Sequence, residues 1–410
     1  MTETAPAVAW PATHLGRVPA LVEHAALLRR VIEPALPDEV ETLPLEAALH
    51  RTTATTVTSP VDLPLFRNSQ MDGFAVRAAD LGGAPVMLPV AGVVAAAAGE
   101  PDPLAPGTAV RIMTGAVVPE GADAVVPVER VETSDGRVSF AAAVAPGTFV
   151  RDRGSDVRAG DTLLPAGLHL QARHLGALAA AGVTEVTVRR RPRIAVLTTG
   201  SELIDVAAVP RPGEVHDANA VALAAAIVAV GAEVVLRARV IDDVAAFDAQ
   251  LDAALAAADL VIASGGISQG DFEVVREALE PRGAWVGTVA MQPGGPQSVA
   301  VLDGVPVVGF PGNPVSTQLS FEVFVAPLLR EHAGMPAAVR EVRRLADAIE
   351  SPRGRQQLLR ARLVDDDGVA PVSGPGSHLV AGLAAADALI DVPAEVTALP
   401  AGTEVEVVRL

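Results

Sequence analysis

The apolar positions of the chain follow different spacings in different regions, and these spacings predict unlike structural parts. Near the N-terminus an apolar residue recurs every three or four positions, which predicts an amphipathic helix through Leu21, Ala25, Leu28 and Ile32. A second, short helix is predicted over residues 45–51. From residue 52 to about residue 190, short valine-rich runs alternate with proline and glycine, so this region is predicted to consist mainly of β-strands.

A different pattern begins after the basic run 189–193. Continuously apolar runs that are typical of buried strands occur at 194–197, 234–236, 260–263 and 305–308, and helical patterns lie between them. Strands that alternate with helices predict βαβ units and a parallel sheet. Glycine-rich turns follow several of these strands, at the edge where open α/β sheets bind ligands. From about residue 336 the short β pattern returns, which predicts a small C-terminal β domain.

The composition narrows the possible chemistry. The chain has 410 residues, half of them apolar, and a formal charge of −18. This acidity argues against nucleic acid or an anionic membrane as a partner. Cysteine, lysine and tyrosine are absent, which excludes disulfides, a Walker A lysine and thiol or Schiff-base nucleophiles. Neither a signal peptide nor a membrane-spanning run is visible, so we expect a cytoplasmic protein.

One glycine-rich loop is a candidate anion-binding site. Residues 264–271 lie between a predicted strand and a helix, where backbone N–H groups can bind an anion. The same residues equally suit a plain strand–helix turn with Asp271 as the helix N-cap. The loop also contains Gly266-x-Ser268-x-Gly270, a serine-hydrolase pattern that would need His378 and a late aspartate as partners. No HGGG-type oxyanion segment accompanies this pattern.

Several carboxylates follow the predicted parallel strands. Glu202 comes after the first strand, Asp242 and Asp243 after the second, and Asp271 after the third. Converging at one sheet edge, they would suit Mg²⁺ together with a phosphate ligand. Taken singly, each of them favours a helix N-cap over a metal ligand, and only the group as a whole points to a metal site. The eight histidines show no metal-ligand spacing, and no dinucleotide-binding glycine motif follows a strand.

Taken together, the motifs resemble one family, the molybdopterin molybdenumtransferases, also called the MoeA or gephyrin E-domain family. The resemblance includes Asn68-Ser69-Gln70-Met71-Asp72-Gly73 and Pro311-Gly312-Asn313-Pro314. The full set, in family order, covers residues 59–64, 68–77, 111–115 with 119–123, 199–203, 264–271, 311–316 and 376–378. This many ordered motifs are far more specific than any one pattern.

The resemblance implies a multidomain α/β plus β fold, with an elongated subunit that forms a homodimer. A molybdopterin-binding α/β domain with a mainly parallel sheet is expected over 191–333. An inserted β-rich domain is expected over 57–158 and a C-terminal β-barrel-like domain over 334–410. Residues 18–56 with 159–190 would form an elongated N-terminal linker domain.

The resemblance also implies a reaction and its residues. Adenylylated molybdopterin and molybdate would give molybdenum cofactor and AMP, assisted by Mg²⁺, and the molybdopterin adenylyltransferase would be a possible contact. Catalytic or cleft-lining roles are implied for Asp72, Thr114, Asp156, Glu202 and Asp271. In one arrangement, some of them would come from the second subunit of the dimer. Mg²⁺ ligands are implied at Asp242, Asp243 and Asp271. The implied substrate-binding residues are Ser264, Gly265, Gly266, Gln292, Gly295, Pro311, Gly312, Asn313, Pro314, Ser316, Arg355 and Ser377.

One segment departs from the family pattern. Where the family commonly has Lys-Pro-Gly-Lys-Pro, this chain has Gln292-Pro293-Gly294-Gly295-Pro296, so two cations for the oxyanion are missing. Each charge-assisted contact of this kind contributes roughly 1.5–3 kcal/mol. The leading hypothesis is an active molybdenumtransferase. The alternatives are a divergent paralogue that binds pterin or partner proteins without catalysis, and a serine hydrolase that uses Ser268.

Overall fold

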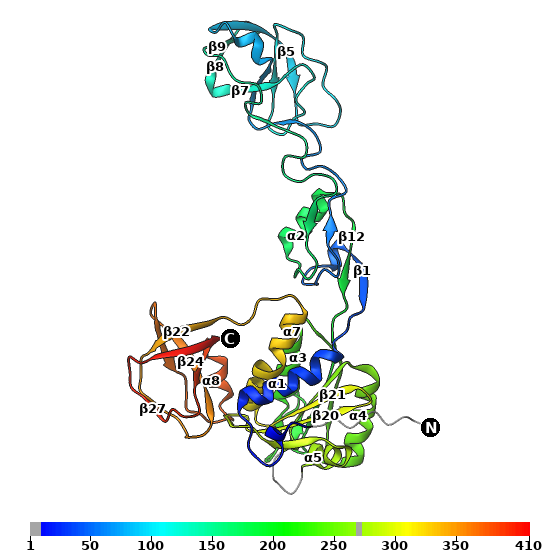
Figure 1. Cartoon of the computed structure of the whole chain (residues 1–410), viewed down its shortest axis with the longest axis vertical. Helices are drawn as coiled ribbons and strands as arrows, with labels where there is room; N and C mark the ends of the chain where they lie inside the picture. Colours follow the sequence, from blue (N-terminus) through cyan, green and yellow to red (C-terminus); the bar gives the residue numbers. More distant parts are fainter. Residues whose placement is uncertain (1–9, 268–272) are drawn as a thin grey trace.

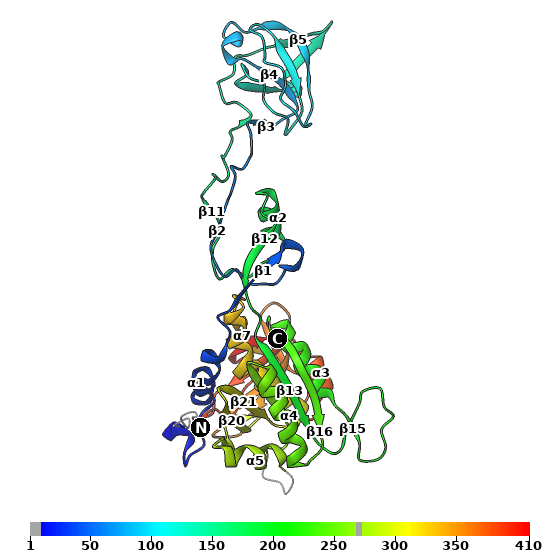
Figure 2. The same ribbon diagram turned by 90° about the vertical axis from the view of Figure 1, so that its right-hand side faces the viewer.

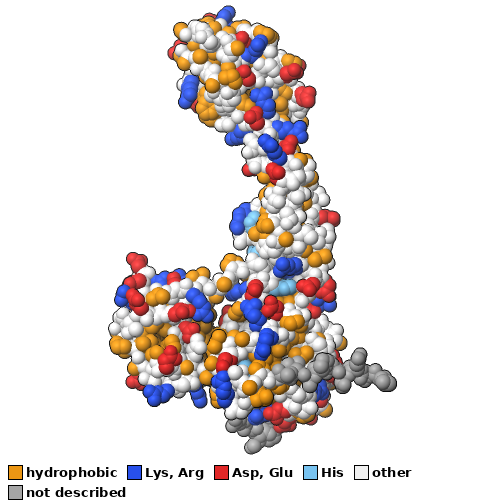
Figure 3. All heavy atoms as spheres, viewed as in Figure 1, with side chains coloured by type: hydrophobic (Ala, Val, Ile, Leu, Met, Phe, Trp, Pro, Cys, Tyr) orange, Lys and Arg blue, Asp and Glu red, His pale blue; other side chains and the backbone are white. Residues whose placement is uncertain are grey.

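The computed structural model describes residues 10–267 and 273–410 and shows an elongated molecule (Figure 1). An α/β unit and a small barrel lie side by side at one end, and a β-rich unit lies at the far end of an extended linker. Figure 2 shows the paired strands of the linker running up to the far unit. Acidic and basic side chains are interspersed over the face seen in Figure 3.

The α/β unit is built on a six-stranded sheet whose strand order is β16-β13-β17-β21-β20-β18. The prediction of parallel strands is confirmed for the first four of these, and β20 and β18 add antiparallel strands at one edge. The strands are β13 (Arg193–Thr199), β16 (Glu233–Val240), β17 (Leu260–Ser264), β18 (Trp285–Thr288), β20 (Pro296–Leu302) and β21 (Val305–Phe310).

Helices cover both faces of this sheet, which explains the continuously apolar strands. In β13, Ile194 and Val196 pack into one core, and Ala195 and Leu197 pack into the core on the opposite face. The predicted N-terminal helix is confirmed as α1 and belongs to the first core. The helices are α1 (Leu21–Ile32), α3 (Ala218–Ala229), α4 (Val244–Ala257), α5 (Val274–Leu279), α6 (Pro314–Ser320) and α7 (Ala326–His332).

The linker is a thin layer of paired strands. β1 (Val40–Pro44) pairs antiparallel with β12 (Glu185–Arg189), β2 (Val57–Thr58) pairs with β11 (Thr162–Leu164), and α2 (Ala172–Ala180) packs beside them. The helix predicted over residues 45–51 is wrong in extent, because only a 3₁₀ turn, Leu45–Ala47, forms. The following residues pair with another segment instead: His50 N donates to Leu170 O.

The far unit has a six-stranded sheet, and the C-terminal unit is a closed barrel. The far sheet contains β7 (Ala124–Pro127), β4 (Gly73–Val76), β6 (Ala109–Ile112), β5 (Val86–Val94), β9 (Arg137–Phe140) and β8 (Val131–Ser134), and β3 (Asn68–Ser69) pairs with β10 (Val150–Arg151) at its base. The barrel contains β22 (Arg340–Leu345), β24 (Gln356–Val364), β25 (Gly368–Pro371), β26 (Ala388–Val392) and β28 (Glu404–Arg409), with α8 (Val380–Ala384) beside it. It closes because β24 pairs with both β25 and β26.

A short parallel pairing joins the barrel to the α/β unit. β19 (Met291–Gln292) lies alongside the start of β24, with Gln292 opposite Gln357. The segment that departs from the family pattern therefore lies at the junction of two structural units. No helix within the described residues is long and apolar enough to cross a membrane.

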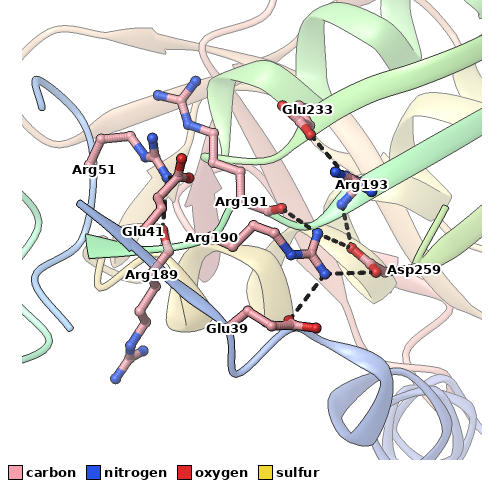
Figure 4. Close-up of polar contacts among 9 residues, drawn as sticks. All are labelled: Glu39, Glu41, Arg51, Arg189, Arg190, Arg191, Arg193, Glu233 and Asp259. Carbon is pink, nitrogen blue, oxygen red and sulfur yellow. Dashed lines mark hydrogen bonds and ion pairs between the residues drawn. The ribbon is translucent and has the colours of Figure 1, made fainter. Parts of the chain in front are cut away.

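The neck between the linker and the α/β unit is held by ion pairs around the basic run 189–193 (Figure 4). Arg190 forms a bidentate pair with Asp259 at 2.9 and 3.0 Å and also reaches Glu39 at 3.2 Å. Asp259 also accepts from the Arg193 backbone N–H at 2.7 Å. Bidentate arginine–carboxylate pairs are geometrically specific and comparatively strong.

Replacing Arg190 by methionine is expected to loosen this neck. The change leaves the mostly buried Asp259 carboxylate without its guanidinium partner, at a cost of about 1–3 kcal/mol. Hydrogen exchange of the backbone near residues 39 and 190 should accelerate. Arg193→Met is the matched control, because its side chain is half exposed and its pair with Glu233, at 3.5 Å, is weak. Equal exchange in the two variants would contradict the prediction.

Candidate active site

A cleft of about 1270 Å³ opens at the carboxyl ends of the parallel strands. Its walls come from the turns after β13, β16, β17 and β21, from residues 286–296, and from Arg355 and the loop 375–380 of the C-terminal unit. This is the sheet edge at which open α/β folds bind ligands. The structure thus brings together most of the substrate-binding residues inferred from the sequence: Gly265, Gly266, Gln292, Gly295, Pro311, Gly312, Asn313, Pro314, Ser316, Arg355 and Ser377 all line the cleft.

Glycines allow the loops of the cleft floor to approach backbone to backbone. Gly265 has φ +98°, and a Cβ there would lie 2.6 Å from the carbonyl oxygen of Thr199. A Cβ on Gly312 would lie 3.3 Å from the Cα of Gly265. The end of β13 and the turns after β17 and β21 are therefore packed against one another with no room for a side chain at Gly265. This leaves backbone atoms at the floor of the cleft.

A buried polar network lies beneath these loops. The amide nitrogen of Asn219 donates to Ser264 Oγ at 2.9 Å and to the Gly312 carbonyl at 2.7 Å. Ser264 Oγ is also 3.1 Å from Thr317 Oγ1. Ser264 is 1 % exposed, so it supports the floor from below and is not part of the lining. The Asn219 amide oxygen is buried without a partner among the described residues.

Asn219 and Asp217 are site residues that the sequence reasoning missed. Asp217 caps α3 by accepting from the Ala220 N–H at 3.0 Å, and it also accepts from Thr198 Oγ1 at 2.6 Å. Both residues line the cleft at the start of α3. The available signal was the Asp-Ala-Asn sequence before an apolar helical pattern, which is a typical helix start.

The carboxylates predicted at the strand ends occupy different places. Glu202 and Asp242 line the cleft, and Asp242 accepts from the Ser201 N–H at 2.8 Å. Asp243 lies outside the lining and caps α4 through the Ala246 N–H at 2.8 Å. Asp271 lies outside the described residues, as does Ser268 of the hydrolase pattern. His378 lines the cleft.

Two arginines bring positive charge to the cleft. Arg276 carries an ion pair with Glu280 at 3.0 Å. Arg355 is exposed at the cleft wall and makes no hydrogen bond or ion pair with the described part of the chain. The Val315 N–H donates to the Ser377 carbonyl at 3.1 Å, which fixes the loop containing Ser377 on the first turn of α6.

The segment 292–296, which lacks the two family lysines, has an ordered backbone. The Gln292 side-chain oxygen accepts from Gln357 at 2.7 Å, across the β19–β24 pairing. A Cβ added at Gly295 would meet a Thr288 methyl carbon first, at 3.4 Å, so the backbone there accepts a side chain. The missing cations therefore reflect a change of side chains on an ordered backbone that still leads along the cleft wall.

Asp72, Thr114 and Asp156 belong to the far unit and its base, away from this cleft within one subunit (Figure 1). Asp72 accepts from the Thr114 N–H at 2.7 Å and from the Thr114 hydroxyl at 2.8 Å. These two hydrogen bonds, the backbone one foremost, hold the pKa of Asp72 below its usual range. Asp72 is thus an ionised carboxylate with a fixed orientation at an exposed loop.

Comparison with known proteins identifies the architecture. The MoeA N-terminal region (domain I and II) matches residues 20–182, a probable molybdopterin binding domain matches 195–331, and the MoeA C-terminal region (domain IV) matches 342–410. The chain belongs to the MoeA family. The predicted resemblance and fold class are confirmed.

Individual MoeA relatives cover almost the whole chain. Molybdopterin molybdenumtransferase 2 of Mycobacterium tuberculosis (strain H37Rv) is 44% identical over 380 residues, which cover 89% of this chain and 94% of the relative. The molybdopterin molybdenumtransferase of Nostoc sp. is 36% identical, covering 91% and 89%. A crystal structure of a molybdopterin biosynthesis MoeA protein from Pyrococcus horikosii superposes with a TM-score of 0.81 at 32% identity, covering 96% of this chain and 99% of that one.

The cleft of this MoeA protein offers a donor set that fits Mg²⁺. Magnesium is held in proteins by one or two carboxylates together with waters and substrate phosphates. Glu202 and Asp242 provide two such carboxylates on the cleft wall. Among the described residues no group of three histidine or acidic side chains forms a complete metal cage. The fit is therefore to a magnesium ion that arrives with a phosphate ligand.

Proposed function

We propose that this MoeA protein inserts molybdate into adenylylated molybdopterin in the cytoplasm, releasing AMP and forming molybdenum cofactor. The observation that carries the proposal is the cleft itself, where glycine-rich turns, four carboxylates and the exposed Arg355 meet at the carboxyl edge of the sheet. Membership of the family supports a transferase over a non-catalytic pterin-binding paralogue. A serine hydrolase has no support from the relatives.

The chemistry of the lining suits an adenylylated pterin. The phosphoanhydride link brings negative charge to a wall that already carries Glu202, Asp217, Asp242 and Glu273. A magnesium ion would offset this charge and polarise the phosphoryl oxygens. We propose Asp242 and Glu202 as its holders, with Asp271 as a third candidate and Asp243 as the helix cap beside them. The backbone of 265–266 and 311–314 would bind the substrate.

We further propose that the active form is a homodimer in which Asp72, Thr114 and Asp156 serve the cleft of the second copy. The far unit is too distant to serve its own cleft in this elongated subunit (Figure 1). Apart from Asn219, helix α3 consists of apolar residues, and two of them on its outer side, Val221 and Val228, are 47% and 60% exposed. An exposed apolar helix face beside the cleft favours a second copy that covers it. The molybdopterin adenylyltransferase remains a candidate contact that would deliver the substrate.

The proposal is tested by AMP release from adenylylated molybdopterin, with Mg²⁺ present, across a molybdate titration. Saturable release at low molybdate is expected. Tight pterin binding without any molybdate-dependent release would contradict the transferase and favour the paralogue. Ser268→Ala should leave AMP release unchanged. Loss of AMP release in this variant would revive the hydrolase hypothesis.

Restoring the family lysines is expected to strengthen molybdate binding. In the double variant Gln292→Lys, Gly295→Lys, the backbone at 295 accepts the new side chain because its neighbours lie at 3.4 Å or more from a Cβ. Each added cation should lower the half-saturating molybdate concentration by about tenfold. Gln292→Met with Gly295→Met is the control that adds bulk without charge. An improvement in both double variants would contradict a charge effect.

A further inference from the structure

One arginine of the barrel is buried with no counter-ion among the residues that the structure describes. Arg360, in β24, is 3% exposed, and within the described part of the chain it forms no ion pair. Its Nε is buried with no hydrogen-bond partner among these residues. Burial lowers the pKa of its guanidinium, and no charged neighbour contributes to that shift. A buried, unpaired cation is costly to a fold, so its retention calls for a compensating contact.

The side-chain hydrogen bond that Arg360 makes leads to the cleft. A terminal nitrogen of its guanidinium donates to the carbonyl oxygen of Gly374. The next residues along the chain, Pro375 to His378, line the cleft. The backbone of Arg360 holds the same loop, because its carbonyl accepts from the Val372 N–H at 2.8 Å. Arg360 is therefore a buried support of the loop that carries Ser377, in addition to the hydrogen bond from Val315.

The same strand connects this support to the other residues expected around the oxyanion. β24 begins one residue after Arg355, which lines the cleft. Gln357, in the same strand, is bonded to Gln292 in the segment that lacks the family lysines. Arg360 thus contacts the loop that leads to Ser377, and its strand begins next to Arg355, an exposed cation of a cleft wall from which the two family lysines are absent.

We propose that Arg360 is a positioning residue for oxyanion binding, which holds the 374–378 loop in place and supplies buried positive charge behind Arg355 and Ser377. The inference rests on the proposed function. A charge inside the protein is screened less than one in water, so it acts through the loop on an anion in the cleft. An oxyanion bound there provides negative charge that no described residue brings to Arg360. Arg360 in this way offsets part of the charge missing at Gln292 and Gly295.

The test compares two substitutions of Arg360 by molybdate binding, measured by calorimetry, and by molybdate-dependent AMP release. Arg360→Gln removes the charge and keeps an amide donor for Gly374, and it should raise both the molybdate Kd and the half-saturating concentration about tenfold. Arg360→Lys keeps the charge and should recover most of this loss. Affinity for the adenylylated pterin and turnover at saturating molybdate should change less than about twofold.

Arg362→Met is the matched control, because Arg362 lies two residues further along β24 and is exposed, and its side chain makes only a 3.4 Å hydrogen bond, to Ala385 O, among the described residues. It should leave molybdate binding unchanged. Equal molybdate affinity in Arg360→Gln and the wild-type chain would overturn the role of Arg360, as would equal losses in Arg360→Gln and Arg360→Lys. Molybdate binding without AMP release in the wild-type chain would contradict the proposed function alone, since the calorimetric comparison still decides the role of Arg360.

Discussion

Replacing Asp242 by asparagine is expected to reduce AMP release about 100-fold and to raise the Mg²⁺ concentration needed for half-maximal release. Asp242 lies on the cleft wall at the end of β16, where its backbone and side chain are locked to Ser201 by hydrogen bonds of 3.2 and 2.8 Å. Removing its charge weakens the proposed magnesium site, and a bound metal contributes several kcal/mol to phosphoryl chemistry. The measurement is AMP release at saturating molybdate across a Mg²⁺ titration.

The neighbouring Asp243 provides the control. Its carboxylate accepts from the Ala246 N–H at the start of α4, outside the cleft lining. Asp243→Ala should therefore cost about 1 kcal/mol of stability through the lost helix cap and leave the Mg²⁺ dependence unchanged. If Asp243→Ala instead shifts the Mg²⁺ titration as far as Asp242→Asn does, Asp243 is a metal ligand, as the family resemblance implies, and the division of roles proposed for the pair is wrong.

Replacing Gly265 by alanine is expected to abolish substrate binding and to destabilise the α/β unit. The new Cβ would lie 2.6 Å from the Thr199 carbonyl oxygen and 2.7 Å from Thr199 Oγ1, on a backbone with φ +98°. Both the clash and the left-handed backbone act together, and the combined cost is about 3–5 kcal/mol. The shorter contact is with the backbone carbonyl of Thr199, the last residue of β13, so it cannot be relieved by a rotamer change. Thermal unfolding and equilibrium binding of adenylylated molybdopterin measure the two effects.

Gly295→Ala is the matched change at the same cleft. There the nearest atoms lie at 3.4 Å or beyond and the backbone is outside the left-handed region, so the melting temperature and pterin binding should stay close to those of the wild-type chain. Comparable losses in the two variants would show that any added methyl in the cleft disrupts binding, and the close approach at Gly265 would then have no special role.

The sequence predicts the structure well where burial can be inferred from the pattern of neighbouring residues. Continuous apolar runs correctly predicted β13 and β17 because helices cover both faces of the sheet. The glycine turns after these strands were found because parallel strands deliver their carboxyl ends to one edge. For the same reason the sequence predicts that Glu202 and Asp242 lie in one cleft.

The remaining features depend on contacts between distant segments. Arg360 lies in a strand sequence in which an arginine is expected to face solvent, yet it is 3% exposed and donates to the carbonyl of Gly374, 14 residues away. The role of Asn219 depends on Ser264 and Gly312, which are 45 and 93 residues away. The failed helix at 45–51 has the same origin, because the pairing of His50 with Leu170 competes successfully with a short local helix.

The ion-paired neck makes the far unit the end of a lever. Two chain crossings, near residues 39 and 190, carry the whole arm, and Arg190 fastens both to Asp259 at its pivot. Because displacement grows with distance from a pivot, a small rotation at Arg190 becomes a much larger displacement of the far unit, which carries Asp72. In the homodimer proposed above, the position of Asp72 relative to the cleft of the second copy would thus depend partly on an ion pair remote from that cleft. The rigidity of the Arg190–Asp259 pair would limit how far the far unit can swing.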